Sequence, residues 1–245
     1  MTDDRLEHEI VHGKLLSEAG AGEIWNWESP AGRLRWQRRV IMLTSHLKPD
    51  MKVLELGCGT GYFTKEAAQS GAEITAIDIS PDLLEQAKSE ISLPNVNFLI
   101  ENAYQMNFDD NTFDAVIGSS VLHHLKIESA LKEIFRVLRP GGTIHFTEPN
   151  MLNPQIALQK NIPFLKKMMG DSPDETAFFA RSLKKKMLKH GFSNIEIKPF
   201  DFLHPAIPKF LLPVMCPFCS ALEKIPLLSS IAGSLFIYAV HPAED

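Results

Sequence analysis

One stretch, VLELGCGTGYFT at residues 53–64, constrains the fold of this chain more than any other. An apolar strand is predicted to run into the loop GCGTG at residues 57–61, and a helix is predicted to begin directly after it. Glycines in such a loop permit backbone conformations that are closed to other residues, and they let a ligand approach the main chain closely. The stretch therefore predicts an open parallel sheet that binds a ligand at the carboxyl end of this strand.

From Met51 onward the sequence alternates short apolar segments with amphipathic ones, which is typical of strands separated by helical crossovers. Strands are predicted at 53–56, 74–77, 96–100, 113–118, 143–147, 194–202 and 234–240. Helices are predicted at about 60–69, 80–91, 127–138 and 175–190, with Ser80 as an N-cap and Gly191 just past a C-terminus. We therefore expect an α/β fold of the doubly wound kind, in which helices cover both faces of a mostly parallel, seven-stranded sheet.

The chain is expected to divide into an N-terminal helical cap at residues 1–50 and a ligand-binding domain at residues 51–245. Within that domain about 30 residues separate the last two predicted strands, where a hairpin needs only a few. This insertion, residues 203–233, is apolar and is predicted to be helical. We expect it to cover the ligand site together with residues 151–174.

The composition argues against several classes of protein. A formal net charge of −5 disfavours nucleic-acid binding, which needs a basic face. Basic clusters at 33–39 and 184–186 are expected to be solvated helix faces, although a recognition role stays open. Three cysteines do not make a disulfide framework, no secretory leader is apparent, and prolines interrupt the most apolar region before it could span a membrane. We therefore expect a cytoplasmic protein.

A carboxylate follows the glycine loop at a fixed distance: Asp78 stands 21 residues after Gly57 and ends the second predicted strand. A carboxylate at this place can accept hydrogen bonds from both hydroxyls of a ribose. The loop, the acid and the order of elements together predict a cofactor that contains a nucleoside. A nicotinamide dinucleotide is the less favoured alternative, because its loop needs a third glycine where this chain continues with Tyr62.

At these residues the chain resembles the class I S-adenosylmethionine-dependent methyltransferases, in the branch of the type 11 methyltransferase domain. The resemblance runs from about Met51 to Asn150 and includes LRPGGTIHFTEPN at residues 138–150. It implies that S-adenosylmethionine is the cofactor and that a methyl group passes to a small-molecule acceptor. The implied cofactor-binding residues are Glu55 near the amino group, Gly57, Cys58, Gly59 and Gly61 at the methionine part, Asp78 at the ribose, Ile79, Asn102 and Ala103 at the adenine, and Ser119 facing the methionine part. At Asn102 this chain departs from the family, where Asp is more usual.

The same resemblance implies an in-line displacement, in which the protein mainly aligns two reactants. A general base is needed only when the attacking atom carries a proton that is hard to lose. The candidate catalytic residues are His123 and His124, after the fourth strand, and Glu148, at the end of the fifth. The alternative is structural: one histidine caps or packs, and Glu148 pairs with a cation.

Two further motifs are expected to have no role in catalysis. HEIVH at residues 8–12 fits a zinc-protease pattern, but it precedes every strand and has no third ligand nearby in the sequence, so we expect an exposed helical turn. CPFC at residues 216–219 lacks both a thioredoxin-like setting and a second ligand pair, so we expect buried apolar cysteines. No metal site is predicted.

The acceptor must be recognised outside the cofactor core, by the cap segments and by Trp25, Trp27, Arg33 and Arg35. So much apolar surface in the insertion favours an apolar or lipid-like acceptor, with arginines for an anionic group. Completion of the core or a homodimer interface is an equal alternative. A non-catalytic, cofactor-binding regulatory protein and a module that contacts the membrane surface also stay open.

Overall fold

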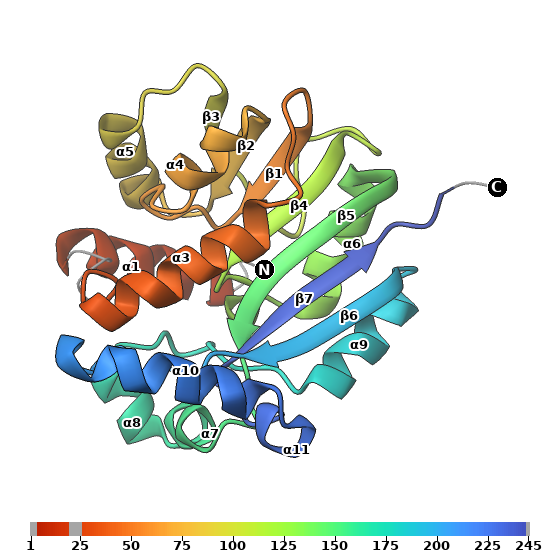
Figure 1. Ribbon diagram of the computed structural model, residues 1–245. Helices are drawn as coiled ribbons and strands as arrows, with labels where there is room; N and C mark the ends of the chain where they lie inside the picture. Colours follow the sequence, from red (N-terminus) through yellow and green to blue (C-terminus); the bar gives the residue numbers. More distant parts are fainter. Residues whose placement is uncertain (1–3, 20–25, 244–245) are drawn as a thin grey trace.

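A seven-stranded sheet forms the centre of the protein, whose computed structural model describes residues 4–19 and 26–243 (Figure 1). The strands are β1 (Lys52–Leu56), β2 (Glu73–Asp78), β3 (Val96–Ile100), β4 (Phe113–Ser119), β5 (Leu138–Pro149), β6 (Ser193–Phe200) and β7 (Ser234–Val240). Their order in the sheet is β3-β2-β1-β4-β5-β7-β6. The first five strands pair in parallel, and β7 lies antiparallel to both β5 and β6. The predicted doubly wound, mostly parallel sheet is confirmed.

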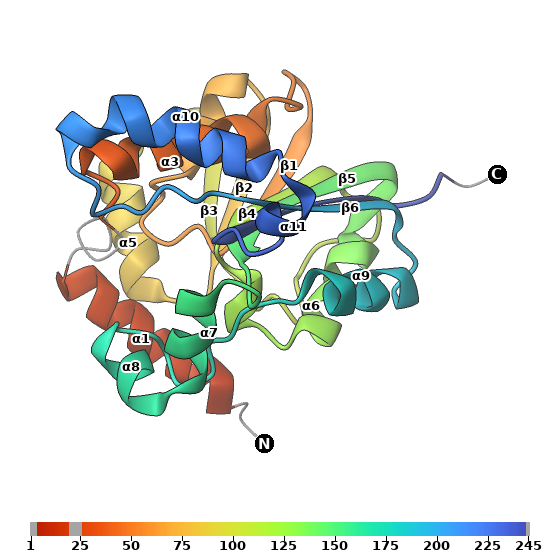
Figure 2. The same cartoon turned by 60° about the horizontal axis from the view of Figure 1, so that its bottom comes forward.

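Helices cover both faces of this sheet, as a parallel sheet requires. They are α1 (Asp4–Ala19), α3 (Pro30–Thr44), α4 (Thr64–Ala67), α5 (Pro81–Glu90), α6 (Ile127–Val137), α7 (Pro154–Asn161), α8 (Pro163–Met168), α9 (Ala180–Lys189), α10 (Leu212–Glu223) and α11 (Pro226–Ser229), with short 3-10 turns η1 (Ala68–Ser70), η2 (Leu122–His124) and η3 (Lys209–Leu211). Figure 2 shows α3 and α10 on one side of the sheet and α6 and α9 on the other. Neighbouring residues of β1 join different cores: Val53 clusters with Leu43 of α3, and Leu54 with Leu131 of α6.

Several predicted boundaries are confirmed, two helix starts are wrong, and the strand predicted at 143–147 begins earlier, at Leu138. Ser80 caps α5 by accepting a hydrogen bond from the main-chain N–H of Leu83, and Gly191 adopts a φ of 94° just after α9. The predicted helix at 60–69 becomes regular only at Thr64, because the preceding residues still belong to the glycine loop. The helix predicted from residue 175 begins at Ala180, because ion pairs hold Glu175 in the loop before it.

The N-terminal helix α1 lies across α5 (Figure 1). Gly13 allows this close approach, since a Cβ there would come within 2.5 Å of the hydroxyl of Ser80. Leu16 and Leu83 form a small apolar cluster at the contact. Of the side chains predicted to cover the site, Trp25 lies outside the described residues. In the described part of the chain, no helix has both the length and the apolar character needed to cross a membrane.

A buried charge network ties α3 to the far edge of the sheet. The side chain of Arg39 is 5% exposed, and its Nη2 lies 2.8 Å from Oδ2 of Asp201 and 2.6 Å from Oγ of Ser234. Arg35 donates to the same carboxylate from Nε at 2.9 Å. Burial lowers the pKa of Arg39 to about 10, so the guanidinium stays charged at neutral pH. The network joins α3 to the segment that leaves β6 and to the beginning of β7.

Replacing Arg39 should therefore destabilise the protein strongly. Arg39→Ala leaves the carboxylate of Asp201 buried with only part of its charge compensated, and we expect a loss of about 3–5 kcal/mol in the free energy of unfolding. Arg33→Ala is the matched control, because the ion pair of Arg33 with Glu28 is exposed and should contribute less than about 1 kcal/mol. Urea denaturation of both variants measures the difference, and equal losses would contradict this account.

Candidate cofactor and active site

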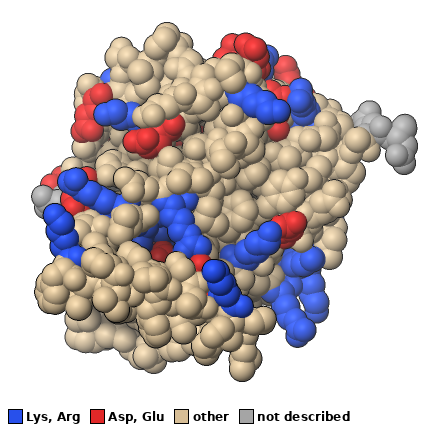
Figure 3. Space-filling model, in the orientation of Figure 1, with Lys and Arg blue, Asp and Glu red and all other residues tan. Residues whose placement is uncertain are grey.

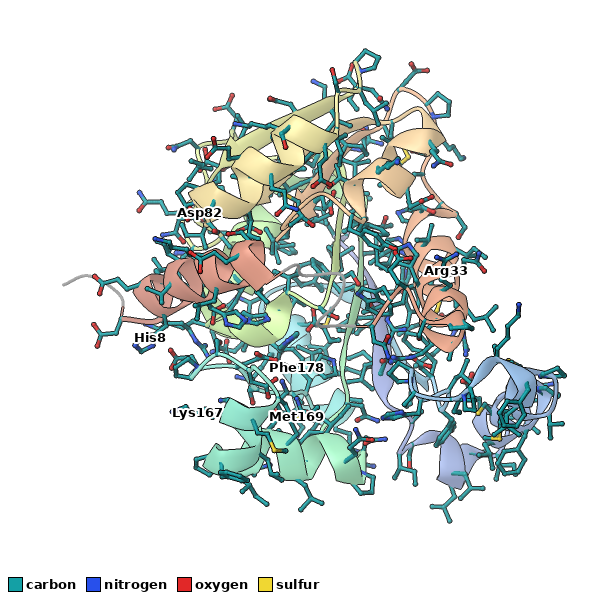
Figure 4. All side chains as sticks on the ribbon, turned by 90° about the vertical axis from the view of Figure 1, so that its left-hand side faces the viewer. His8, Arg33, Asp82, Lys167, Met169 and Phe178 are labelled. Atoms are coloured by element: carbon teal, nitrogen blue, oxygen red, sulfur yellow. The ribbon has the colours of Figure 1, made fainter. Side chains whose placement is uncertain are left out.

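A cavity of about 220 Å³ opens at the carboxyl ends of β1, β2 and β4. The glycine loop lines one side of the cavity, and Leu16 of α1 and Trp36 of α3 also line it. In Figure 4 the view falls on this side of the molecule, with α1, which carries His8, in front and α3, which carries Arg33, to the right. The cavity therefore lies where the sequence predicted a ligand, at the strand ends of the sheet.

The three glycines of the loop all adopt positive φ, at 66° for Gly57, 54° for Gly59 and 78° for Gly61. A Cβ at Gly57 would come within 2.3 Å of Val121, and a Cβ at Gly61 within 2.5 Å of Ile91. At Gly59, in contrast, a Cβ would meet no atom within 4 Å. The outer two glycines thus allow tight packing of the loop, and Gly59 leaves main chain open to the cavity.

Cys58, in the same loop, lines the cavity as a neutral thiol. Its side chain is buried, and burial raises the pKa of the thiol well above its ordinary value. A thiol of this kind is a poor nucleophile. Its place supports the prediction that Cys58 packs within the loop.

Asp78 joins the end of β2 to the glycine loop on β1. Its Oδ2 accepts a hydrogen bond of 2.8 Å from the main-chain N–H of Gly59, and its Oδ1 accepts one of 2.9 Å from Ser80. Each carboxylate oxygen can accept a further hydrogen bond. Asp78 and its neighbour Ile79 both line the cavity, in the places that the sequence predicted for a ribose and an adenine.

Glu55 brings a second carboxylate to the cavity, from the middle of β1. Its side chain is buried, and its Oε2 has no hydrogen-bond partner among the described residues. Burial, together with the nearby charge of Asp78, raises the pKa of Glu55 to about 8, although Thr64 acts in the opposite direction. A buried carboxylate with an unfilled oxygen fits a cationic ligand group, such as the amino group of S-adenosylmethionine. The donor set at this end of the cavity therefore fits the predicted cofactor.

The remaining predicted cofactor residues separate into two groups. Ala103 and Ser119 line the cavity. Asn102 does not; its Oδ1 accepts a hydrogen bond from the main-chain N–H of Tyr104 and shapes the turn after β3. Several lining residues were not predicted from the sequence, among them Trp36, Glu101 and Tyr104.

His123 and Glu148 form a buried pair beside the cavity without lining it. Nδ1 of His123 lies 2.6 Å from Oε2 of Glu148, and Nε2 lies 3.3 Å from Oε1 of Glu175. Burial by itself would lower the pKa of His123, but the two carboxylates outweigh it and raise the pKa to about 9. Glu148 also accepts hydrogen bonds from the main-chain N–H groups of Val121 and Leu122. This geometry fits the structural alternative, in which Glu148 pairs with a cation and braces the turn after β4.

His124 faces the cavity itself, on the 3-10 turn η2. Its Nδ1 lies 2.9 Å from Oε2 of Glu9, a residue of α1 whose side chain is only 12% exposed. Burial would raise the pKa of Glu9, but its contacts with His124 and with the hydroxyl of Ser172 lower it. His12 also lines the cavity, one turn further along α1.

These contacts correct the expectation that HEIVH is an exposed turn. His8 and Val11 are solvent-exposed, whereas Glu9, Ile10 and His12 are partly buried. Nδ1 of His8 lies 2.7 Å from Oδ2 of Asp174. The sequence held a signal that could have located the buried face of α1: Leu6, Glu9, Gly13 and Leu16 recur at helical spacing and all line the cavity. What the sequence could not show is that this face lies on the cofactor site.

One group of side chains in the described part of the chain has the spacing of a metal site. Donor atoms of His123, His124 and Glu175 all lie within 4.8 Å of one another. Lys160 already forms an ion pair with Glu175, and Glu148 pairs with His123. The charges of Glu175 and His123 are thus already balanced by other side chains of the protein. CPFC, the other metal-like motif, holds a buried Cys219 and a half-buried Cys216, both free thiols.

Comparisons with known proteins agree with the fold. Residues 54–146 match the family model of a methyltransferase domain. A demethylmenaquinone methyltransferase from Staphylococcus epidermidis is 32% identical over 186 residues, which cover 66% of this chain and 76% of the relative. A ubiquinone/menaquinone biosynthesis C-methyltransferase from Hydrogenovibrio crunogenus is 31% identical and covers 78% of this chain and 85% of the relative.

Solved structures share the whole fold at lower identity. A chain of the complex between the Haloferax volcanii Trm112 methyltransferase activator and a methyltransferase superposes with a TM-score of 0.69 at 17% identity, covering 100% of this chain and 99% of that one. A Haemonchus contortus phosphoethanolamine N-methyltransferase in complex with S-adenosylmethionine gives 0.64 at 19% identity, covering 90% of this chain and 56% of that one.

The glycine loop, the two carboxylates of Glu55 and Asp78 and the order of the strands in the sheet define a class I, doubly wound methyltransferase site. The chain belongs to the S-adenosylmethionine-dependent methyltransferases of the methyltransferase-domain family. It is an enzyme whose cofactor is S-adenosylmethionine.

The raised pKa of Glu55 predicts that cofactor binding releases a proton. At a pKa of about 8 the free carboxyl is mostly protonated at neutral pH, and it must ionise to pair with the amino group of the ligand. The affinity for S-adenosylhomocysteine should therefore fall as the pH decreases from about 8 to about 6, by up to about tenfold per unit. Calorimetry in buffers of different ionisation enthalpy measures the released proton. Glu55→Gln should bind more weakly, with a smaller pH dependence. A wild-type protein that takes up or releases no proton would contradict this role.

Proposed function

We propose that this enzyme methylates a ring carbon of an apolar, quinol-like acceptor. The observation that carries the proposal is the apolar and aromatic wall beside the cofactor loop: Trp27, Trp36 and Tyr62 line the cavity together with Leu6 and Leu16. Trp36 lies 5.4 Å from Trp27 and 4.6 Å from Tyr62 between ring centroids, so the three side chains make one aromatic surface. Curated relatives named for quinone methylation support this acceptor class.

The cofactor roles follow from the donors at the cavity. Glu55 would pair with the amino group, the main chain at Gly59 would lie against the methionine part, and Asp78 would accept hydrogen bonds from the ribose. When bound, S-adenosylmethionine supplies a methyl group that is already activated for transfer. The task left to the protein is to align the acceptor and to manage its proton.

His124 is the proposed general base. It is the one candidate catalytic residue from the sequence that faces the cavity, and it can take the hydroxyl proton of a quinol. Loss of that proton places negative charge on the oxygen and on the adjacent ring carbon, which would then accept the methyl group as its bond to sulfur breaks. The hydrogen on that carbon would leave as a proton while the oxygen is protonated again, which restores the aromatic quinol. Glu9 acts as a positioning residue, because its carboxylate orients the ring of His124 and stabilises the imidazolium that forms.

Other expectations from the sequence stay predictions. They are the cytoplasmic location, the homodimer, the absence of nucleic acid as a partner, and the division into a cap and a catalytic domain. The arginines expected to bind an anionic group of the acceptor act elsewhere: Arg35 pairs with Asp201, and Arg33 with Glu28. An anionic acceptor group therefore has no place in the proposal.

Replacing His124 should abolish turnover and leave cofactor binding intact. With a short-chain demethylmenaquinol and labelled S-adenosylmethionine, we expect His124→Ala to lower kcat by about 10²- to 10⁴-fold. Glu9→Gln should lower it less and shift the pH profile, because His124 keeps its ring but loses the adjacent charge. Lys14→Ala, on the same helix and solvent-exposed, is the control and should change neither. Full activity of His124→Ala would rule out its role, and an inactive wild-type protein would rule out this acceptor.

A further inference from the structure

Two helical segments present large apolar side chains to solvent. They are α7–α8 and the stretch η3–α10–α11, which together we name the apolar surface. The most exposed members are Leu227 at 82%, Phe210 at 78%, Phe164 at 73%, Val214 at 67%, Met168 at 62%, Leu158 at 57% and Phe218 at 54%. An exposed apolar surface of this size marks a site of contact with a membrane or with another molecule.

The apolar surface adds almost nothing to the core of the protein. None of α7, α8, η3 and α11 has a buried residue, and α10 has only Cys219. The insertion was expected either to complete the core or to face a ligand or partner. Because its apolar side chains are exposed, the structure favours contact with a ligand or partner. The apolar residues of these segments are thus available for contact outside the chain.

The charge of these segments differs from that of the whole chain. Residues 151–170 contain no acidic residue, and residues 202–231 contain one, Glu223, which pairs with Arg38. Of the five lysines in the same two ranges, Lys160 is buried in ion pairs with Asp171 and Glu175, and Lys166 donates to main-chain carbonyls. The other three, Lys167, Lys209 and Lys224, are exposed, although the chain as a whole has a net charge of −5. In Figure 3 the lower part of the molecule, over α10 and α11, is tan and almost free of red. Apolar side chains among lysines are complementary to the surface of an anionic bilayer.

The two segments meet at one end of the molecule, from opposite sides of the sheet. Asn153, the N-cap of α7, donates from Nδ2 to the carbonyl of Ile231 at 2.9 Å, and Asn150 donates to the carbonyl of Ser230. Figure 1 shows α7, α8, α10 and α11 at the lower end of the molecule, and Figure 2 shows α10 on the side of the sheet that carries α3 and α7–α8 on the other side. In Figure 4 Lys167 and Met169 mark the end of α8 at this end of the molecule.

Polar contacts connect the apolar surface to the walls of the cavity. Lys160 of α7 pairs with Glu175, which in turn contacts His123 next to the cavity. On the other side Glu223 of α10 accepts hydrogen bonds from Arg38 of α3, the helix that also carries Trp36. The segments that bear the apolar side chains are therefore attached to both sides of the site.

We propose that the apolar surface docks on an anionic lipid bilayer. Phe164, Phe210 and Leu227 enter the interface, and Lys167, Lys209 and Lys224 contact the headgroups. A second copy of the chain fits less well, because a two-fold contact pairs this surface with itself and would bring two sets of lysines into one interface without free acidic partners. The docking itself does not depend on the identity of the acceptor. Together with the proposed function, it places the cavity at the bilayer, where an apolar quinol resides.

Vesicle co-sedimentation of the full chain tests the proposal. The wild-type protein should sediment with phosphatidylcholine vesicles that contain phosphatidylglycerol, and less with phosphatidylcholine alone. The triple variant Phe164→Ser, Phe210→Ser, Leu227→Ser should lose partitioning by about tenfold or more, because it removes three large apolar side chains from the contact. All three side chains are more than 70% exposed, so the fold should tolerate the changes.

A matched triple variant controls for the loss of apolar surface in general. Leu93→Ser, Ile100→Ser and Leu188→Ser change exposed apolar residues near β3 and on α9, outside the apolar surface, and should sediment as the wild type does. Both triple variants should bind S-adenosylhomocysteine like the wild type, so a failure of docking is distinguished from a failure of the cofactor site.

A charge-reversal pair tests the lysines separately. Lys209→Glu with Lys224→Glu should abolish the preference for phosphatidylglycerol, whereas Lys65→Glu with Lys132→Glu, also exposed, should leave it unchanged. The proposal is overturned if the wild-type protein does not sediment with either vesicle, or if the first triple variant sediments equally well. It is also overturned if the wild type is a dimer that this variant converts to a monomer without any vesicle binding.

Discussion

The hydrogen bond from the main chain of Gly59 to the carboxylate of Asp78 is the contact on which the site depends. It joins the loop after β1 to the end of β2, two strands that lie side by side in parallel register. Because both strands end at the same edge of the sheet, a single carboxylate can fix the loop and still offer acceptor positions to a ribose. The positive φ of Gly59 turns the main chain so that its N–H reaches that carboxylate.

Around this fixed centre, the cover of the site is held mainly by polar contacts. The helix α1 shares a small apolar cluster with α5, and its polar links to the protein include Glu9 with His124 and Ser172, and Arg5 and His8 with Asp174. Contacts of this kind are individually weak and are partly screened by salt. A cover attached in this way can open for an acceptor while the sheet and the glycine loop stay in place.

Local patterns were enough to predict the sheet and the cofactor loop. Strand alternation, the glycines, the cap at Ser80 and the carboxylate at Asp78 each depend on residues close together in the sequence. Tertiary contacts were not accessible in the same way. The pairing of Glu9 with His124 joins residues 115 positions apart in the chain, and the network of Arg39 with Asp201 joins α3 to the end of β6. The two misplaced helix starts have the same cause, since the ion pairs of Glu175 and the packing of the glycine loop override local helical preference.

The most direct test of this account is calorimetric titration of the wild-type protein and of Asp78→Ala with S-adenosylhomocysteine, beside a titration with NAD. The account predicts saturable binding to the wild type, no binding of NAD, and a loss of at least about tenfold in affinity in a variant that still unfolds cooperatively, because the ribose loses its acceptor. A wild-type protein that ignores S-adenosylhomocysteine, or a variant that binds it equally well, would contradict the assignment of this cavity as the cofactor site.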